Sequence, residues 1–413
     1  MEEGRRRVEV TKQAFDFRGS STTLFIVHSG FEVFPPKGYG GGERFAYGLA
    51  KAASRGCRVV LVDFGKQESF FVESDLEVWR IKNKFYVHSP RHYISYLNAL
   101  SSMLLLLAFL VSKRGRLRRS LFYFHGGLEY AVFRTLQRLL APSLCLAYIF
   151  RLQSPRWMDL QLLRSWEKFL AIPTEIYGVK TADLVIFESD TVKSTVARFC
   201  GPPRDSMVIP NLVDTEFFKE SPRAKVQFGI LYAAVVKPQK NQLDVVRAIK
   251  KVVASEPRAS LLLVGDPAVL SYYRSVKDEV ARLQLSDHVE FMRSVDILQL
   301  NRIRSAYPIQ LVYSTYTGFD VAIGETMSLG AACVFSRLPT LEGIVEDEID
   351  CLLVDPQSPD QLADAIIKLL GNPAQVSRLS KAARKTAMEK LSWRTFSAPF
   401  LDKLFTLSAR RSS

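Results

Sequence analysis

The chain alternates short apolar runs with longer stretches whose apolar residues recur at helical spacing. Residues 24–27 and 58–62 form two such runs, and between them residues 43–54 place Phe45, Leu49 and Ala52 on one helical face. This alternation is typical of parallel sheets covered by helices on both faces.

The same pattern continues to the C-terminus and divides the chain into two halves. The first half has predicted strands at residues 24–27, 58–62, 121–124, 145–150 and 184–187, and the run 207–210 closes it. The second half starts near residue 228, with predicted helices at 243–254 and 272–283 and strands at 230–236, 260–264, 289–292, 309–313 and 332–335.

At 413 residues the chain is too long for one ordinary core. We therefore expect an N-terminal domain at 1–220, a C-terminal domain at 221–390 and a last helix at 391–413. The polar segment 215–226 is the predicted hinge.

Composition narrows the class of protein and its compartment. A hydrophobic content of 47% excludes a largely disordered chain. The five cysteines are scattered and lack metal-type spacing, which favours a reduced, cytoplasmic protein without a metal site. The charged start, residues 1–7, does not have the pattern of a signal peptide.

The net charge of +14 is partly concentrated in residues 113–119, which carry five Lys or Arg side chains. The preceding residues 92–112 contain no Asp, Glu, Lys or Arg. A membrane-spanning helix has the required length here but would separate strands of one sheet. A buried helix is the second interpretation. The third, which we favour, is a helix within residues 103–119 that rests on an anionic membrane surface.

The most informative run is residues 318–330, which lies between the apolar segments 309–313 and 331–335. It combines a glycine-containing turn with a short helix that ends at Gly330. Free amides at a helix start attract anions. The acid within the helix, Glu325, can accept hydrogen bonds from hydroxyl groups such as those of a ribose. An acid near a helix start is also favourable without any ligand.

Two further features follow predicted strands of the first half. Gly40, Gly41 and Gly42 open a helix after the first strand, where they suit either a phosphate site or a tight turn without ligand. His125 ends the strand 121–124, at the edge where α/β folds place ligands.

These motifs resemble those of family-4 retaining glycosyltransferases, enzymes of the two-domain GT-B fold. The family pattern is an acid, seven residues and a second acid, and Glu325 matches the second acid whereas Thr317 stands at the first. Gly40, Gly41 and Glu43 match the family's Gly-Gly-x-Glu loop.

The resemblance extends to a phosphate-binding lysine and to the segment that links the two halves. Lys240 matches the lysine that neutralises the donor phosphates, but Val235 stands where the family has an arginine. Residues 208–218 match the Ile-Pro-Asn-Gly-Val-Asp pattern, with Leu212 in place of glycine.

The resemblance implies an α/β GT-B fold with two Rossmann-like doubly wound domains facing a central cleft and a C-terminal helix that crosses back. It implies three catalytic residues: His125, Lys240 and Glu325. It implies a donor site formed by Gly40, Gly41, Gly42, Lys240, Thr317, Gly318, Phe319, Asp320, Val321 and Glu325.

The expected reaction is transfer of a hexosyl unit from a nucleotide diphosphate sugar to a hydroxyl acceptor, with retention and without a metal. The expected acceptor is a lipid-linked glycan or glycolipid at the cytoplasmic membrane face, and we expect no nucleic-acid partner. Because Val235 and Thr317 replace groups that the family uses, a catalytically silent scaffold paralogue is the alternative. An epimerase or a phosphorylase of the same architecture is a third hypothesis.

Overall fold

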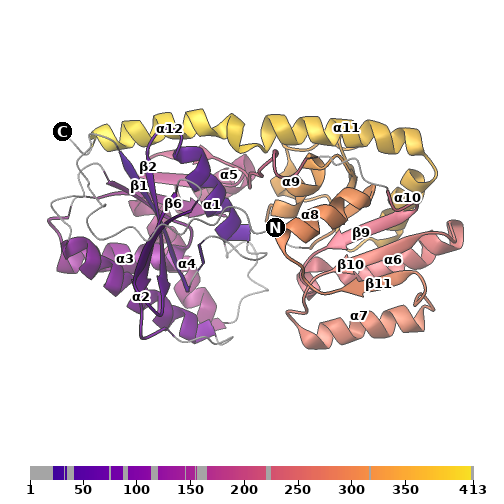
Figure 1. The fold of residues 1–413 in the computed structure, drawn as a ribbon, viewed down its shortest axis with the longest axis horizontal. Helices are drawn as coiled ribbons and strands as arrows, with labels where there is room; N and C mark the ends of the chain where they lie inside the picture. The colour runs from indigo at the N-terminus through magenta and orange to yellow at the C-terminus, as the bar shows by residue number, and fades with distance from the viewer. Residues whose placement is uncertain are drawn as a thin grey trace. The chain divides into compact units, whose positions relative to one another are not determined.

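The computed structural model describes residues 22–31, 33–34, 41–73, 76–86, 92–112, 120–144, 146–153, 155, 165–219, 225–315 and 318–410. These residues form two compact units (Figure 1). The first unit comprises the chain up to Pro210 together with the segment from Phe396, and the second comprises Asn211–Thr395. The domain limits expected after residues 220 and 390 stay a prediction.

The first unit is built on an eight-stranded sheet of order β3-β4-β2-β1-β5-β6-β7-β8. Only β3 runs antiparallel, against β4. The strands are β1 (Thr23–Phe31), β2 (Arg58–Gly65), β3 (Ser69–Glu73), β4 (Leu76–Lys82), β5 (Ser120–Phe124), β6 (Ala147–Leu152), β7 (Leu184–Phe187) and β8 (Ser206–Val208).

Helices connect these strands and supply the first unit's core. They are α1 (Gly41–Ala53), α2 (His92–Ser112), α3 (Gly127–Leu140), α4 (Ser165–Thr181) and α5 (Asp190–Cys200). One core cluster packs alternate residues of the strands, such as Phe25 and Val27, against α2 and α3. β5 and β6 are buried along their whole length, which explains why both appear in the sequence as continuous apolar runs.

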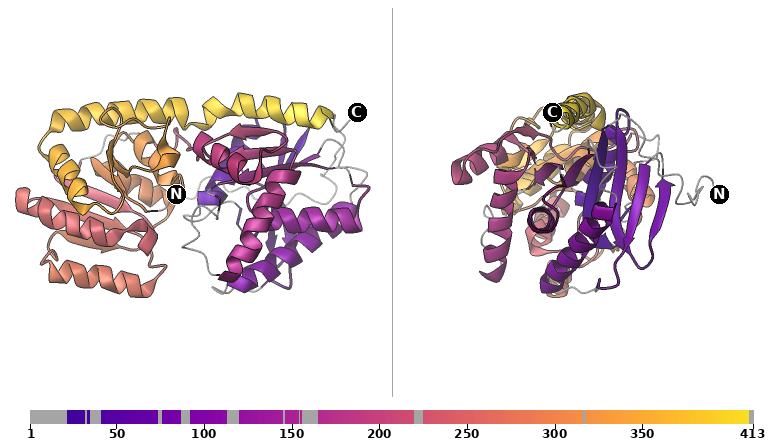
Figure 2. Two further views of the ribbon diagram at one scale, coloured as in Figure 1. Left: turned by 180° about the vertical axis from the view of Figure 1, so that it is seen from behind. Right: turned by 90° about the vertical axis from the view of Figure 1, so that its left-hand side faces the viewer.

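The last helix, α12 (Trp393–Arg410), returns to the first unit. Its residues Phe400 and Leu404 are buried. A Cβ atom added at Gly56 would lie 2.9 Å from the Leu401 side chain, so α12 packs closely on this glycine. Lys403 forms an ion pair of 2.7 Å with Asp205. In Figures 1 and 2 the yellow helix that ends near the C-terminus runs across the top of the first unit, so the predicted crossing-back of the C-terminal helix is confirmed.

The second unit holds a six-stranded, fully parallel sheet of order β11-β10-β9-β12-β13-β14. Its strands are β9 (Gly229–Ala233), β10 (Ser260–Val264), β11 (Val289–Met292), β12 (Ile309–Val312), β13 (Ala332–Ser336) and β14 (Leu352–Val354). Its helices are α6 (Gln242–Ser255), α7 (Leu270–Arg282), α8 (Ile297–Ala306), α9 (Val321–Ser328), α10 (Pro359–Leu370) and α11 (Pro373–Lys390).

Two apolar layers enclose this sheet because successive strand residues point to opposite faces. On β13, Ala332 and Val334 join the layer that includes α6, α7 and α10. Cys333 and Phe335 join the other layer, which includes α9 and α11. The predicted α/β fold with two Rossmann-like units is therefore confirmed, and the predicted strands of both halves are present.

Several elements were not predicted from the sequence. Three strands were not identified: β3, β4 and β14. The same holds for six helices: α3, α4, α5, α8, α10 and α11. The antiparallel pair of β3 and β4 adds an edge to the first sheet, in a region that carries no recognisable motif.

Candidate functional site

The candidate site of the second unit lies where the order of the strands along the sheet reverses. β9 is followed along the chain by β10 on one side of it, whereas its other neighbour, β12, leads on to β13. In open parallel sheets, the carboxyl ends of strands at such a switch point are the usual ligand-binding place. Lys240 follows β9, and the helix α9 follows β12.

Hydrogen bonds hold the segments after these two strands together. The short 3₁₀ turn Pro238–Lys240 accepts bonds at the Gln239 carbonyl from the Thr315 amide and the Ser314 hydroxyl, both at 3.0 Å. The buried Tyr232 hydroxyl donates to the Lys240 carbonyl at 2.5 Å. These bonds fix the backbone from which the Lys240 side chain extends.

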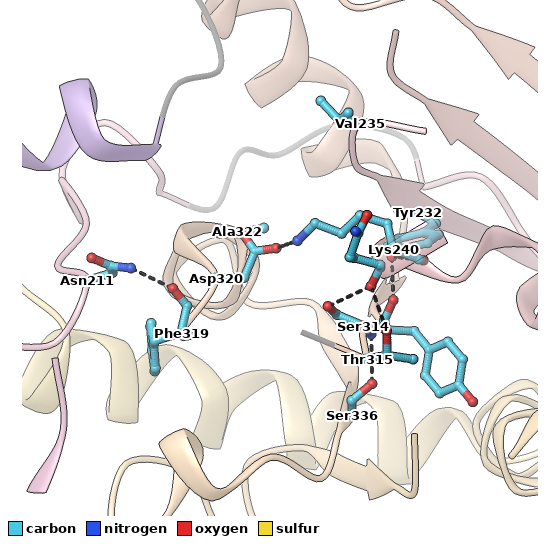
Figure 3. A network of polar contacts seen from close by, with 12 residues as sticks. Asn211, Tyr232, Val235, Lys240, Ser314, Thr315, Phe319, Asp320, Ala322 and Ser336 are labelled. Carbon is cyan, nitrogen blue, oxygen red and sulfur yellow. Dashed lines mark hydrogen bonds and ion pairs between the residues drawn. The ribbon is translucent and has the colours of Figure 1, made fainter. Parts of the chain in front are cut away.

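The Lys240 ammonium forms an ion pair with the carboxylate of Asp320, which comes directly before α9 (Figure 3). Asp320 has a second role, because its Oδ1 accepts a hydrogen bond of 3.1 Å from the Ala322 amide and thereby caps the helix. The ammonium is therefore held at a helix N-terminus, a combination of positive groups that suits a phosphate.

The surroundings of Asp320 keep its carboxylate ionised. Burial alone would raise the pKa of Asp320, but the Lys240 ammonium and the bond from Ala322 outweigh it and lower that pKa to about 2. Lys237 lies close by, and burial together with Lys240 lowers its pKa, while Asp320 opposes that change. Two lysines and one carboxylate thus share this end of the sheet.

Glu325 lies inside the second unit, with 1% of its side chain exposed. Its Oε2 is 3.5 Å from Nη2 of Arg304, whose side chain is 3% exposed. Arg304 also donates to the Thr326 hydroxyl at 2.6 Å and to Oε1 of Gln310 at 3.2 Å. The carboxylate expected to bind a ribose therefore belongs to a buried polar network.

The turn before α9 is fixed by the segment that enters the second unit. Asn211 is fully buried, and its amide donates to the Phe319 carbonyl at 2.5 Å (Figure 3). Gly318 and Val321 are buried, and the Phe319 side chain packs in the core of the second unit. Only the backbone groups of these three residues can contribute to a ligand site.

The first unit contains the other predicted site residues. Gly42 lies in the first turn of α1, and a Cβ atom there would be 2.9 Å from Nε2 of His125. A side chain at this position would therefore require His125 or α1 to shift. The His125 ring bonds to the Tyr123 hydroxyl at 3.0 Å and to Oε1 of Gln153 at 3.3 Å.

His125 is uncharged at neutral pH. Burial and, to a smaller extent, the neighbouring Arg151 guanidinium lower the pKa of His125 to about 3. Arg151 is itself 1% exposed, stacks 3.5 Å from the Phe45 ring centre and donates to the Ile209 carbonyl at 2.9 Å. A base with so low a pKa accepts protons poorly, and the catalytic role of His125 stays a prediction.

The structure thus brings Lys240 and Asp320 together in the second unit. It brings Gly42 and His125 together in the first unit. Gly40 and Thr317 lie outside the described residues. Sequence reasoning missed the side-chain roles of Asp320 and Arg304. An Asp directly before a helix is a recognisable capping signal, but nothing local to the sequence could reveal a partner 80 residues away.

A surface groove of about 620 Å³ lies beside α2 in the first unit, lined by Phe85, Ser101, Leu104, Leu105, Leu107, Ala108, Val111 and Leu140. One face of α2 is buried, including Met103 and Leu106, whereas Leu104 and Val111 remain 40% and 39% exposed. Of the helices described, none has the length and hydrophobicity needed to cross a bilayer. The basic residues 113–119 lie outside the described residues.

Two family models match the chain and together account for more than half of it. The model for Glycosyltransferase Family 4 matches residues 39–217, and the model for Glycosyl transferases group 1 matches residues 227–372. The chain belongs to this family of GT-B glycosyltransferase enzymes.

Curated relatives match over parts of their length. The MMP α-(1→4)-mannosyltransferase of Mycolicibacterium hassiacum is 25% identical over 244 residues, which span 59% of this chain and 58% of that protein. The D-inositol 3-phosphate glycosyltransferase of Saccharomonospora viridis is 26% identical over 241 residues, 54% of this chain and 56% of the relative. The chain thus spans somewhat more than half the length of these relatives.

Solved structures match the fold over nearly the whole chain. Sucrose-phosphate synthase from Thermosynechococcus elongatus has a TM-score of 0.81 at 21% identity, covering 94% of this chain and 100% of that one. Anabaena HepE in complex with UDP-glucose has a TM-score of 0.71 at 17% identity, with coverage of 94% and 100%.

Proposed function

We propose that this chain is a retaining glycosyltransferase that moves a hexosyl unit from a nucleotide diphosphate sugar to a hydroxyl acceptor. The observation that carries the proposal is the Lys240 ammonium held at the N-terminus of α9, at the switch point of a fully parallel sheet. A lysine in this place neutralises charge that develops on a departing diphosphate.

Lys237 is our candidate for the second cation that the diphosphate needs. Val235 supplies no charge, and Lys237 follows it by two residues, with its pKa lowered by burial and by Lys240. Burial makes the largest contribution to this lowered pKa and the Lys240 ammonium the next, and the negative charge of a bound diphosphate would raise the pKa again.

A lipid-linked acceptor at the cytoplasmic membrane face is the finer part of the proposal. Its support is the apolar groove beside α2 together with the five positive charges that follow this helix in the sequence. Partly exposed apolar side chains next to basic residues are the pattern of proteins that rest on anionic bilayers. A further relative, from Mycobacterium tuberculosis and 24% identical over 239 residues, is named GDP-mannose-dependent α-(1-6)-phosphatidylinositol monomannoside mannosyltransferase.

The test is a transfer assay with purified protein, a panel of nucleotide sugars and glycolipid or sugar acceptors. We expect release of nucleoside diphosphate with formation of a glycoside whose anomeric configuration, read by NMR, is that of the donor. Lys240→Met should lower the rate by about a hundredfold, since one lost transition-state cation costs a few kcal/mol. The matched control is Lys368→Met, which removes an exposed lysine paired with Glu348 and should leave the rate unchanged.

Metal independence is part of the same proposal, and a chelator should leave the transfer rate unchanged. Inversion at the anomeric carbon would overturn the retaining mechanism while leaving a glycosyltransferase. No turnover with any donor, combined with donor binding, would instead support the silent scaffold hypothesis, which rests on Val235 and Thr317.

A further inference from the structure

We infer that Asp320 is a positioning residue that competes with the donor's phosphates for the Lys240 ammonium and thereby weakens nucleoside diphosphate binding. The inference rests on the proposed function and concerns the same site. It differs from the expectation that Asp320 is one of the residues that bind the donor.

The two carboxylate oxygens of Asp320 perform separate tasks. Oδ1 accepts from the Ala322 amide at 3.1 Å and starts α9, while Oδ2 pairs with Lys240 (Figure 3). The cap anchors the carboxylate, so the negative charge stays beside the lysine whether or not a ligand is bound. The side chains of Lys240 and Asp320 are 15% and 25% exposed, which leaves the pair within reach of a ligand.

Phosphate oxygens need the same two groups that Asp320 already uses. A phosphate at the start of α9 would take hydrogen bonds from the ammonium and from the helix amides. The carboxylate holds both an ammonium hydrogen bond and the Ala322 amide, and its own charge repels the incoming anion. A phosphate can therefore bind only by replacing the Asp320 carboxylate as the partner of the Lys240 ammonium. The binding free energy is then less favourable than at a lysine without an ion pair.

A purely structural pair makes the opposite prediction. If Asp320 only stabilised α9, neutralising it would loosen the helix start and leave nucleotide affinity the same or lower. Competition predicts that the affinity rises. The direction of the change therefore separates the two explanations.

The experiment measures binding of UDP, GDP and ADP to wild type and to Asp320→Asn by calorimetry at low and high salt. Asparagine keeps the N-cap acceptor but removes the charge. We expect the nucleotide that binds the wild type to bind Asp320→Asn about tenfold more tightly at low salt, and the gain to shrink as salt rises. Asp320→Ser, also a good cap, replaces the variant if Asp320→Asn does not fold.

The matched control is Asp296→Asn. Asp296 caps α8 in the same unit through a 2.8 Å bond from the Gln299 amide, and among the described residues it has no ion pair. This variant should leave the affinity unchanged. In the Lys240→Met background, Asp320→Asn should lose most of its gain, because the contested ammonium is gone.

The outcomes distinguish this inference from the proposed function. Binding to wild type that is equal or weaker in Asp320→Asn overturns the competition and leaves the donor site intact. If Asp320→Asn raises the nucleotide affinity by the same factor in the Lys240→Met background, the competition is also overturned. Absence of binding to both wild type and Asp320→Asn overturns the donor site itself, and the competition with it.

Discussion

The Glu325 carboxylate is almost completely buried, and the Arg304 guanidinium lies 3.5 Å from it. Two buried charges are tolerated only when they neutralise each other and find hydrogen-bond partners, which Thr326 and Gln310 supply to the arginine. Glu325 therefore has a structural task, independent of any ribose hydroxyl that it binds.

Glu325→Gln should destabilise the second unit by about 3 kcal/mol, because the buried Arg304 would lose its ion pair with Glu325. Urea unfolding of both single variants and of the double variant Arg304→Met/Glu325→Gln measures the coupling. We expect the double variant to lose at least about 1 kcal/mol less than the sum of the single variants. Strict additivity would contradict a shared network.

The ribose role of Glu325 has its own readout in the same variant. Wild type should bind a nucleoside diphosphate more tightly than its 2′,3′-dideoxy analogue, and Glu325→Gln should narrow that preference. A loss of stability without any change in the preference would leave Glu325 as a structural residue only.

At the residue scale, the sequence identified positions but not their partners. Lys240 and Glu325 could be predicted because each belongs to a local motif. The ion pair of Lys240 with Asp320 and that of Glu325 with Arg304 join residues from different elements, so only the fold brings them together. The neutral state of His125 likewise depends on burial, which its local sequence does not report.

Among the elements, α2 shows why an apolar pattern alone is ambiguous. Its central residues are apolar on every side, so helical periodicity could not distinguish a core-facing surface from an outward one. The structure does distinguish them, since Leu107 and Leu110 are buried whereas Leu100 and Leu104 are about 40% exposed. The outward face is the one available to a bilayer.

The paired substitution Leu104→Ser/Val111→Ser should weaken binding to vesicles that contain phosphatidylglycerol by at least about tenfold, since each buried leucine-sized side chain contributes roughly 1.5–3 kcal/mol. Cosedimentation measures the effect. Leu298→Ser, at a 59% exposed leucine on α8 of the second unit, is the control and should bind as wild type does. Equal vesicle binding by wild type and the double variant would show that α2 does not contribute to membrane binding.

At the scale of the whole molecule, the first unit is assembled from two distant parts of the chain. α12 buries Phe400, Leu404 and Leu407, and its Ser408 accepts a 3.0 Å bond from Thr22. The helical pattern of this tail could be predicted from the sequence, as could its return, through the family resemblance. The residues that receive it, such as Gly56 and Asp205, could not, because they carry no motif.

Phe400→Ala should destabilise the first unit by about 3–5 kcal/mol, the usual result of emptying a buried phenylalanine site. The measurement is hydrogen exchange of the two units under native conditions, with faster exchange expected in the first unit only. Phe405→Ala, on the same helix at a 42% exposed position, should change stability by less than about 0.5 kcal/mol. Equal effects of the two variants would contradict the packing of α12.

The return of α12 also affects the order in which the two units can fold during translation. The second unit is one continuous stretch, Asn211–Thr395, and it can fold as soon as that stretch has left the exit tunnel. The first unit is synthesised earlier but lacks α12 until residues 396–410 have been made. Its eight strands are all made before the second unit, but the surface that receives α12, at Gly56 and Asp205, stays uncovered while the second unit is synthesised. Chaperones would therefore find binding sites on the first unit during that time.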